Sequence, residues 1–125
     1  MRKDEIIVYK VTMNGKSCFS PYIEDKYRLS YGIGEITIPK IGKIFAFKDI
    51  DSARYFANEQ EPYYVGIIEL FKCIGVPSRA KPLIIQFADD LVCFFRKKAL
   101  NSKRIQAPMG TIMMNYIIPI RKERI

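Results

Sequence analysis

The first half of the chain alternates short apolar runs with turn residues, a pattern typical of β-strands. The run from Glu5 to Met13 is rich in isoleucine and valine, and it ends at Asn14-Gly15, the strongest short signal for a β-hairpin. The return strand is expected at Ser17–Ser20 and ends before Pro21. Three more strands, separated by glycines, are expected at Tyr27–Tyr31, Glu35–Pro39 and Lys43–Phe47.

A helix is expected after these strands. Asp49 can cap its first turn, and the helix is expected to end near Gln60 because Pro62 cannot continue it. Arg54 lies off the apolar face, so its guanidinium is placed to meet either solvent or a ligand. Four apolar residues recur at helical spacing and predict the buried face: Ile50, Ala53, Phe56 and Ala57.

A long, nearly continuous apolar strand is expected at Tyr64–Ile74. Its only charges are Glu69 and Lys72, so we expect it to lie centrally in a sheet. A last strand is expected at Ile112–Ile120, and the basic tail that follows it, Arg121–Ile125, is expected to fray.

A second helix is expected between these two strands, after a loop at Gly75–Pro82. Asp89 or Asp90 can cap it, and the cations Arg96-Lys97-Lys98 stand in its last turns, where positive charge suits the helix dipole. The element order therefore predicts one α+β domain over residues 1–125, with an antiparallel or mixed β-sheet decorated by two α-helices.

Positive charge gathers toward the C-terminal third. The chain has 21 basic and 13 acidic side chains, for a net charge of +8. Residues 1–80 hold twelve basic and ten acidic side chains, whereas residues 81–125 hold nine and three. An anionic partner would therefore be steered to the C-terminal third, although a basic surface that only serves solubility is the competing interpretation.

The composition excludes several kinds of chemistry. The chain has no histidine, so Ser-His-Asp triads, Cys-His pairs and histidine-metal sites are impossible. Its cysteines, Cys18, Cys73 and Cys93, are widely spaced and are expected to be reduced thiols in a cytoplasm. No signal peptide, membrane-spanning run or phosphate-binding glycine loop is recognised. We expect no metal, no cofactor, no catalytic residue and no enzymatic activity.

Residues suited to a phosphorylated ligand occur in three places. The run from Arg96 to Arg104 holds five cations and no acid, and guanidinium groups hold phosphate oxygens in a bidentate manner. The loop Ala107–Thr111 offers backbone N–H groups near Gly110 for an anion nest, although Met109 stands where a cation would suit phosphate better. A solvated helix end and an ordinary turn are the structural alternatives. At the N-terminal hairpin, Phe19 can stack on a base and Ser17 can bond a ribose, in place of an ordinary return strand.

Several short segments together are similar to one protein family. They are Val8-Tyr9-Lys10-Val11, Ser17-Cys18, Tyr31-x-x-Gly34, Gly42-Lys43-Ile44-Phe45-Ala46-Phe47 with Ala53 and Phe56, and Ala107-Pro108-Met109-Gly110-Thr111. On these residues, over about residues 5–120, the chain resembles the first-type Thoeris anti-defence proteins, a family of phage-encoded nucleotide sponges.

The resemblance implies a binding function in the cytoplasm of a bacterial host. Members of this family sequester glycocyclic ADP-ribose, the signal made by a TIR-domain enzyme, so that the downstream effector stays inactive. Some also bind cyclic trinucleotides, and they assemble as dimers or hexamers. For this chain we expect no membrane partner, and a small nucleotide is favoured over nucleic acid. The contacts expected here are phosphate to Arg96, Arg104 and Thr111, base to Phe19 or Phe94, and ribose to Ser17 or Asn101, with Arg54, Met109 and Gly110 nearby.

Three other functions stay open. A small basic nucleic-acid-binding regulator fits the net charge of +8, although no helix-turn-helix, RNP strand or zinc finger is visible. An ADP-ribosyltransferase-like enzyme is suggested by Arg28-Leu29-Ser30 and Glu69, and for it we predict no turnover of NAD. An anti-defence protein that blocks a host protein by direct contact would need no small molecule.

Overall fold

The structure, a computed structural model, describes residues 2–17, 29–39, 42–60, 67–79, 83–85, 104–106 and 109–125. This part is mostly antiparallel β-structure with one helix, which agrees with the α+β class in its coarse form. The second predicted helix, near residues 89–100, lies outside it. The one described helix is too short to cross a membrane. The elements are β1 Ile6–Met13, β2 Lys16–Ser17, β3 Ile44–Phe47, α1 Ile50–Gln60, β4 Ile68–Pro77, β5 Leu83–Ile85, β6 Arg104–Gln106 and β7 Thr111–Glu123.

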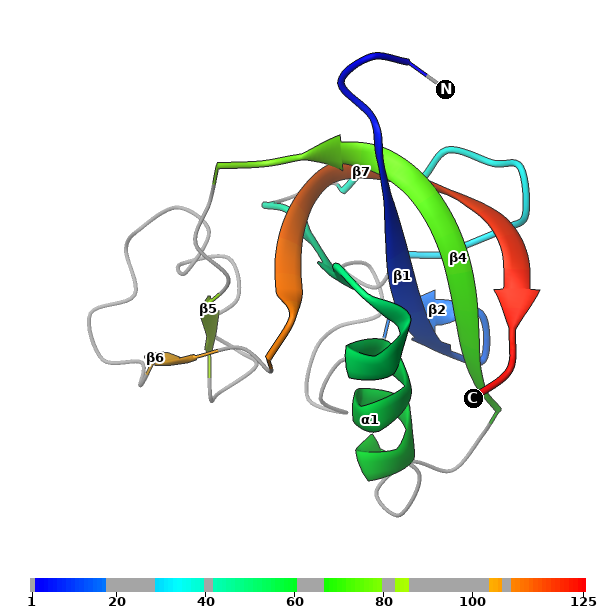
Figure 1. The fold of residues 1–125 in the computed structure, drawn as a ribbon, viewed down its shortest axis with the longest axis vertical. Helices are drawn as coiled ribbons and strands as arrows, with labels where there is room; N and C mark the ends of the chain where they lie inside the picture. Colours follow the sequence, from blue (N-terminus) through cyan, green and yellow to red (C-terminus); the bar gives the residue numbers. More distant parts are fainter. Residues whose placement is uncertain are drawn as a thin grey trace.

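Strands β1, β3, β7 and β4 close into a small barrel. β1 pairs with β3, β3 with β7, β7 with β4, and β4 pairs again with β1, all in antiparallel register. Figure 1 shows β4 and β7 as two curved arches that run side by side, with β1 alongside β4. Two register shifts between β4 and β7, at Lys72/Cys73 and Val76/Pro77, mark bulges, which bend strands and so help the ring to close.

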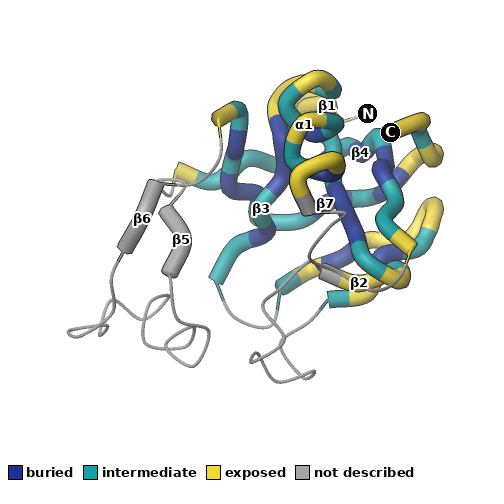
Figure 2. Tube along the Cα trace, turned by 90° about the horizontal axis from the view of Figure 1, so that it is seen from below, coloured by how far each residue is buried: buried dark blue, intermediate teal, exposed yellow. Residues whose placement is uncertain are grey.

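Apolar side chains from every strand of the ring fill the barrel. Figure 2 shows the buried positions, in dark blue, along the strands, with exposed positions at the turns. These side chains alternate with outward-facing residues along each strand, as the two-residue period of β-structure requires. Those at 2% exposure or less include Val8, Ile44, Ala46, Cys73, Met114, Ile117 and Pro119.

Helix α1 covers part of the outer face of the barrel. Its predicted apolar face is confirmed: Ala53 and Ala57 pack against Val11, Phe47 and Leu70, with Ile50 and Phe56 beside them. The predicted cap is also confirmed, because Asp49 Oδ1 accepts the backbone N–H of Ser52 at 2.8 Å.

Both ends of the curved strand β7 contact α1. At the first end, the Lys48 N–H donates to the Gly110 carbonyl at 2.8 Å, and Gly110 lies so close to Ser52 that a Cβ would stand 2.5 Å from the Ser52 Oγ. Just beyond the other end, Arg54 Nε donates to the Arg124 carbonyl at 2.9 Å. The helix therefore spans the gap between the two ends of this strand.

The predicted hairpin is present, but the strands around it are shorter than expected. Asn14 and Gly15 have φ of 54° and 76°, as the tight turn requires. Of the return strand, Lys16–Ser17 is paired, and residues 18–20 lie outside the described part. The strands expected at Tyr27–Tyr31 and Glu35–Pro39 appear among the described residues as two isolated bridges, Lys16↔Ser30 and Thr37↔Ile117.

Strand β4 extends beyond its predicted end. Residues 75–77 were expected in a loop, yet they pair with β7 up to Pro77. The loop was predicted from Gly75 and Pro77, and the strand accommodates each of them for a different reason. Glycine is needed at position 75 because β4 and β7 lie very close together there. A Cβ would stand 2.1 Å from the Tyr116 carbonyl oxygen. Pro77 ends the strand next to a bulge, where a missing N–H is tolerated.

The prediction that the basic tail frays was wrong for its first part. Arg121–Glu123 belong to β7 and pair with Leu70–Lys72 of β4. The strand continues past Pro119 because that residue stands at a register shift, where the ladder needs no N–H donor. Pairing with β4 completes the ring and fixes a segment that looks disordered when only its charge is considered.

Candidate functional site

The described structure places part of the predicted ligand-binding set. The loop Met109–Thr111 and Arg54 are described with their side chains. Ser17 lies on β2 and Arg104 on β6, where the backbone alone is described. The remaining predicted contacts lie outside the described residues: Phe19, Phe94, Arg96 and Asn101.

The loop Met109–Thr111 lies at the start of β7, against the first turn of α1. Met109 is 90% exposed, and Gly110 adopts a φ of 84° that favours glycine. Thr111 is buried and stands opposite Phe47 in the ladder. The carboxylate of Asp49 lies 3.3 Å from where a Gly110 Cβ would stand. The Asp49 carboxylate already interacts with the positive N-terminal end of the helix. Its negative charge also repels a phosphate beside the loop.

Arg54 lies on the other flank of the helix. Residues two apart in an α-helix project about 200° apart, so Arg54 and Ser52, which contacts the loop, face opposite sides. Its hydrogen bond to the Arg124 carbonyl holds Arg54 at the C-terminal end of β7. The structure therefore places Arg54 and the loop Met109–Thr111 on opposite flanks of the helix. Arg54 contacts the end of β7 instead of this loop.

The strands at this end of the barrel also carry a cross-strand row with an aromatic ring and two cations. Tyr9 of β1 stands opposite Lys72 of β4, and Lys72 stands opposite Arg121 of β7. Residues that face each other in this way project on the same side of the sheet. We call the row, together with Arg54 and Arg124, the basic C-terminal patch.

One acid balances part of this positive charge, and a second pairs with the adjacent residue Lys122. Arg121 Nε lies 2.7 Å from Glu123 Oε1, and the Arg121 side chain is 64% exposed. Lys122 Nζ lies 3.0 Å from Glu69 Oε2. The cations of these pairs are exposed, whereas the side chains of Glu123 and Glu69 are 19% and 23% exposed, so an anionic ligand can reach the cations from solvent. The patch cations Lys72, Arg121, Arg54 and Arg124 outnumber the single carboxylate of Glu123.

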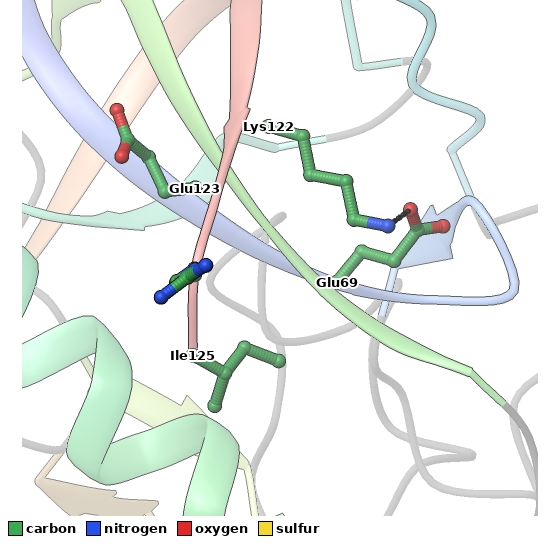
Figure 3. Close-up of a pocket in the computed structure, with 5 residues that line it drawn as sticks. Glu69, Lys122, Glu123 and Ile125 are labelled. Carbon is green, nitrogen blue, oxygen red and sulfur yellow. Dashed lines mark ion pairs between the residues drawn. The ribbon is translucent and has the colours of Figure 1, made fainter.

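A depression of about 370 Å³ adjoins the patch, and it is open to solvent. Figure 3 shows Lys122 and Glu69 pointing toward each other, with Glu123 on the other side of β7. Neighbouring residues of a strand alternate between faces, so this arrangement is expected. The depression can receive one charged end of a ligand but does not enclose a whole nucleotide. Its lining residues are Glu69, Lys122, Glu123, Arg124 and Ile125.

Two polar residues on the inner face of β1 were not predicted as functional residues from the sequence. Lys10 Nζ donates to the Phe45 carbonyl at 2.7 Å and lies 5.5 Å from the centre of the Tyr31 ring. Thr12 is fully buried, and among the described residues its Oγ1 is the buried side-chain atom with no hydrogen-bond partner. The available signal was the spacing, since both share the inward face with Val8.

The described residues offer little for covalent or metal chemistry. Cys73 lies opposite Val8 inside the barrel, and burial raises the pKa of its thiol to about 12. A thiol with this pKa is protonated at neutral pH and is a poor nucleophile. In the ranges that the structure covers, no group of three or more cysteines and carboxylates is placed to hold a metal ion.

Comparison of the chain with protein-family models, with curated proteins and with solved structures finds no match. The resemblance to the first-type Thoeris anti-defence proteins therefore stays a prediction.

Proposed function

We propose that this chain binds a small cyclic nucleotide signal, of the glycocyclic ADP-ribose type, and sequesters it without chemical change. Cyclic trinucleotides belong to the same proposed ligand class. In this proposal the basic C-terminal patch holds the phosphates. The observation that carries it is the row Tyr9–Lys72–Arg121, which joins cations to an aromatic ring across three strands.

The chemistry of the ligand fits this row. A pyrophosphate carries two negative charges, and the Arg121 guanidinium can hold two of its oxygens once it leaves Glu123. Lys72 adds a second cation beside it. The Tyr9 ring is half-buried against the apolar cluster between α1 and the barrel. The exposed part of this ring can contact a base. Such binding requires no nucleophile and no general base.

Sequestration also requires tight binding, of about −12 kcal/mol for a nanomolar dissociation constant. The open depression of a single chain buries too little of a nucleotide for this affinity. We therefore propose that the working form is a homo-oligomer, a dimer or a hexamer, in which a second copy covers the ligand.

The test is capture followed by release. The purified protein is incubated with glycocyclic ADP-ribose made by a TIR-domain enzyme, washed, denatured by heat, and the released material is analysed by mass spectrometry. Recovery of the intact nucleotide is the expected result. Release of a changed species would instead indicate an enzyme, and recovery of nothing would refute the proposal.

A pair of matched variants locates the site. We expect Lys72→Gln with Arg121→Gln to weaken nucleotide binding at least 100-fold in isothermal titration calorimetry, because both phosphate-holding cations are lost. Lys16→Gln with Lys48→Gln removes the same charge from exposed positions elsewhere and should leave the dissociation constant unchanged. Equal losses in both variants would show that net charge alone attracts the ligand.

A nucleic-acid-binding regulator is the second candidate, and the excess of cations favours it. Salt dependence separates the two functions. A ligand with two phosphates releases few counterions, so its affinity should fall by less than tenfold between 50 and 200 mM salt, whereas binding to long DNA loses about 10³-fold or more. A protein that acts by direct contact would instead form a stable complex with a host protein and bind neither.

A further inference from the structure

The segment around Thr37 forms an exposed edge of the barrel sheet. Thr37 exchanges both backbone hydrogen bonds with Ile117 of β7, at 2.8 and 3.2 Å. Because successive residues of a strand direct their N–H and C=O groups to opposite sides, those of Ile36 and Ile38 point away from β7. In the part of the chain that the structure describes, the backbone groups of Ile36 and Ile38 make no hydrogen bond.

The side chains at this edge are apolar and exposed. Thr37 is buried, so Ile36 and Ile38 face outward, and they are 53% and 62% exposed. The antiparallel bridge between Thr37 and Ile117 places Ile36 beside Ile118. Ile118 in turn stands opposite Ile74.

An isoleucine row thus crosses the outer face of the barrel and ends at the open edge. It continues from Ile74 to Ile7, which stand opposite each other across β4 and β1. Ile7 is 42% exposed, and the row lies beyond the part of the outer face that α1 covers. We call Ile7, Ile74, Ile118 and Ile36 the outer isoleucine row.

Soluble proteins normally protect such an edge. A lysine, an inward-pointing charge or a bulge at the edge prevents another strand from pairing there. Here the edge-facing backbone groups that have no hydrogen bond among the described residues belong to isoleucines. Pro39 does not block the edge, because its nitrogen is on the same side of the strand as that of Thr37, toward β7. Glu35, which is exposed, is the one charge directly beside this edge among residues 35–39.

We infer that the edge at Ile36–Ile38 is a docking site for an extended segment of a partner protein, which adds to the sheet as a further strand. The edge-facing N–H and C=O groups of Ile36 and Ile38 supply the backbone hydrogen bonds, as in other cases of strand addition. Branched apolar side chains at alternate positions of the guest lie beside Ile36 and Ile38 and prolong the outer isoleucine row. A lysine or arginine in the guest stands beside Glu35.

The charge at the edge favours a partner segment over a second copy of this chain. If two copies paired antiparallel about Thr37, Glu35 of each would stand opposite Pro39 of the other and would meet no cation at that position. A basic guest strand satisfies the carboxylate. This inference is independent of nucleotide binding, because Lys72 and Arg121 do not belong to the edge.

The test uses the full chain and a labelled peptide, fluorescein-Lys-Val-Thr-Val-Thr-Val, in a fluorescence anisotropy titration. We expect saturable binding, lost when alternate amides of the peptide are N-methylated, because these amides supply the hydrogen bonds. The protein variant Ile36→Lys with Ile38→Lys should bind at least tenfold more weakly. Ile33→Lys, at an exposed isoleucine in the preceding turn, should bind as the unaltered chain does.

Three results would overturn the inference. They are the absence of binding, binding that survives N-methylation, and a self-associated state in sedimentation analysis that the Ile36/Ile38 variant loses and the peptide does not disturb. The last result would assign the edge to a second copy. Because the N-methylated peptide is tested on the unaltered protein, the inference stays falsifiable even if the double variant fails to fold.

Discussion

Gly75 lies where β4 and β7 approach each other most tightly, so Gly75→Ala tests the closure of the barrel directly. A Cβ at this position would stand 2.1 Å from the Tyr116 carbonyl oxygen and 3.1 Å from the Ile117 Cα. Both contacts are with backbone, so no side chain can swing away. The two strands would have to separate by about 1 Å within a close-packed barrel. Gly75 itself has an ordinary φ, and the effect is therefore steric.

The expected cost is at the upper end of what overpacking produces, about 3 kcal/mol in the free energy of unfolding. Against a typical total of about 5–15 kcal/mol, this is a large fraction of the stability. It corresponds to a fall in the melting temperature of about 10 °C. Urea unfolding followed by circular dichroism measures the free energy, and a thermal scan gives the melting temperature.

Two glycine variants act as controls. Gly32→Ala meets the end of the Glu35 side chain, which can move, so a loss of less than about 0.5 kcal/mol is expected. Gly34→Ala points into open space but carries a φ of 78°, so only the backbone cost of about 1 kcal/mol is expected. A Gly75→Ala protein as stable as the Gly32→Ala protein would refute the tight crossing of β4 and β7.

Four further predictions each concern the surroundings of one residue. Asp49→Ala removes the helix cap and should cost about 1 kcal/mol in urea unfolding. Thr12→Val should leave stability unchanged or raise it, because it replaces a buried hydroxyl that has no partner with a methyl group of the same shape. Cys73, whose pKa burial raises to about 12, should react with a thiol reagent in denaturant far faster than in the folded protein. Hydrogen bonds from the Arg2 N–H and the Tyr116 hydroxyl lower the pKa of Glu5 below 4.5, so its contribution to stability is present above pH 4.5 and is lost as the pH falls through the lowered pKa. Acid unfolding of Glu5→Gln, compared with that of the unaltered chain, should show a weaker pH dependence in that range.

Local features of the fold could be predicted from the sequence. The hairpin at Asn14-Gly15 and helix α1 with its Asp49 cap depend on residues within a few positions of each other, so their signals are complete in short windows. The end of β4 and the order of the tail could not be predicted in this way. Gly75 and Arg121 are set by partners about 40 to 50 positions away in the sequence, and the chain carries no local mark of that pairing.

The same difference between local and distant partners explains which residues of the candidate site could be predicted. Arg54 was recognised because its place off the apolar face follows from helical spacing alone. The patch residues Lys72 and Arg121 were not recognised, because one was assigned to the middle of a sheet and the other to a fraying tail. The antiparallel register that brings them together emerges only when the ring closes. The roles predicted for Phe19, Phe94, Arg96 and Asn101 stay predictions, since these residues lie outside the described part.

The position of β7 in the barrel has a consequence for biosynthesis. This strand, at residues 111–123, is the ladder partner of both β3 and β4, so the nascent chain cannot complete its ring until that segment has left the ribosome. Until then the apolar inner faces of the earlier strands remain exposed to chaperones and to aggregation. Pairings between distant segments also make folding slow. Slowing translation should therefore not help this protein to fold, whereas a chaperone that holds the unfinished chain should.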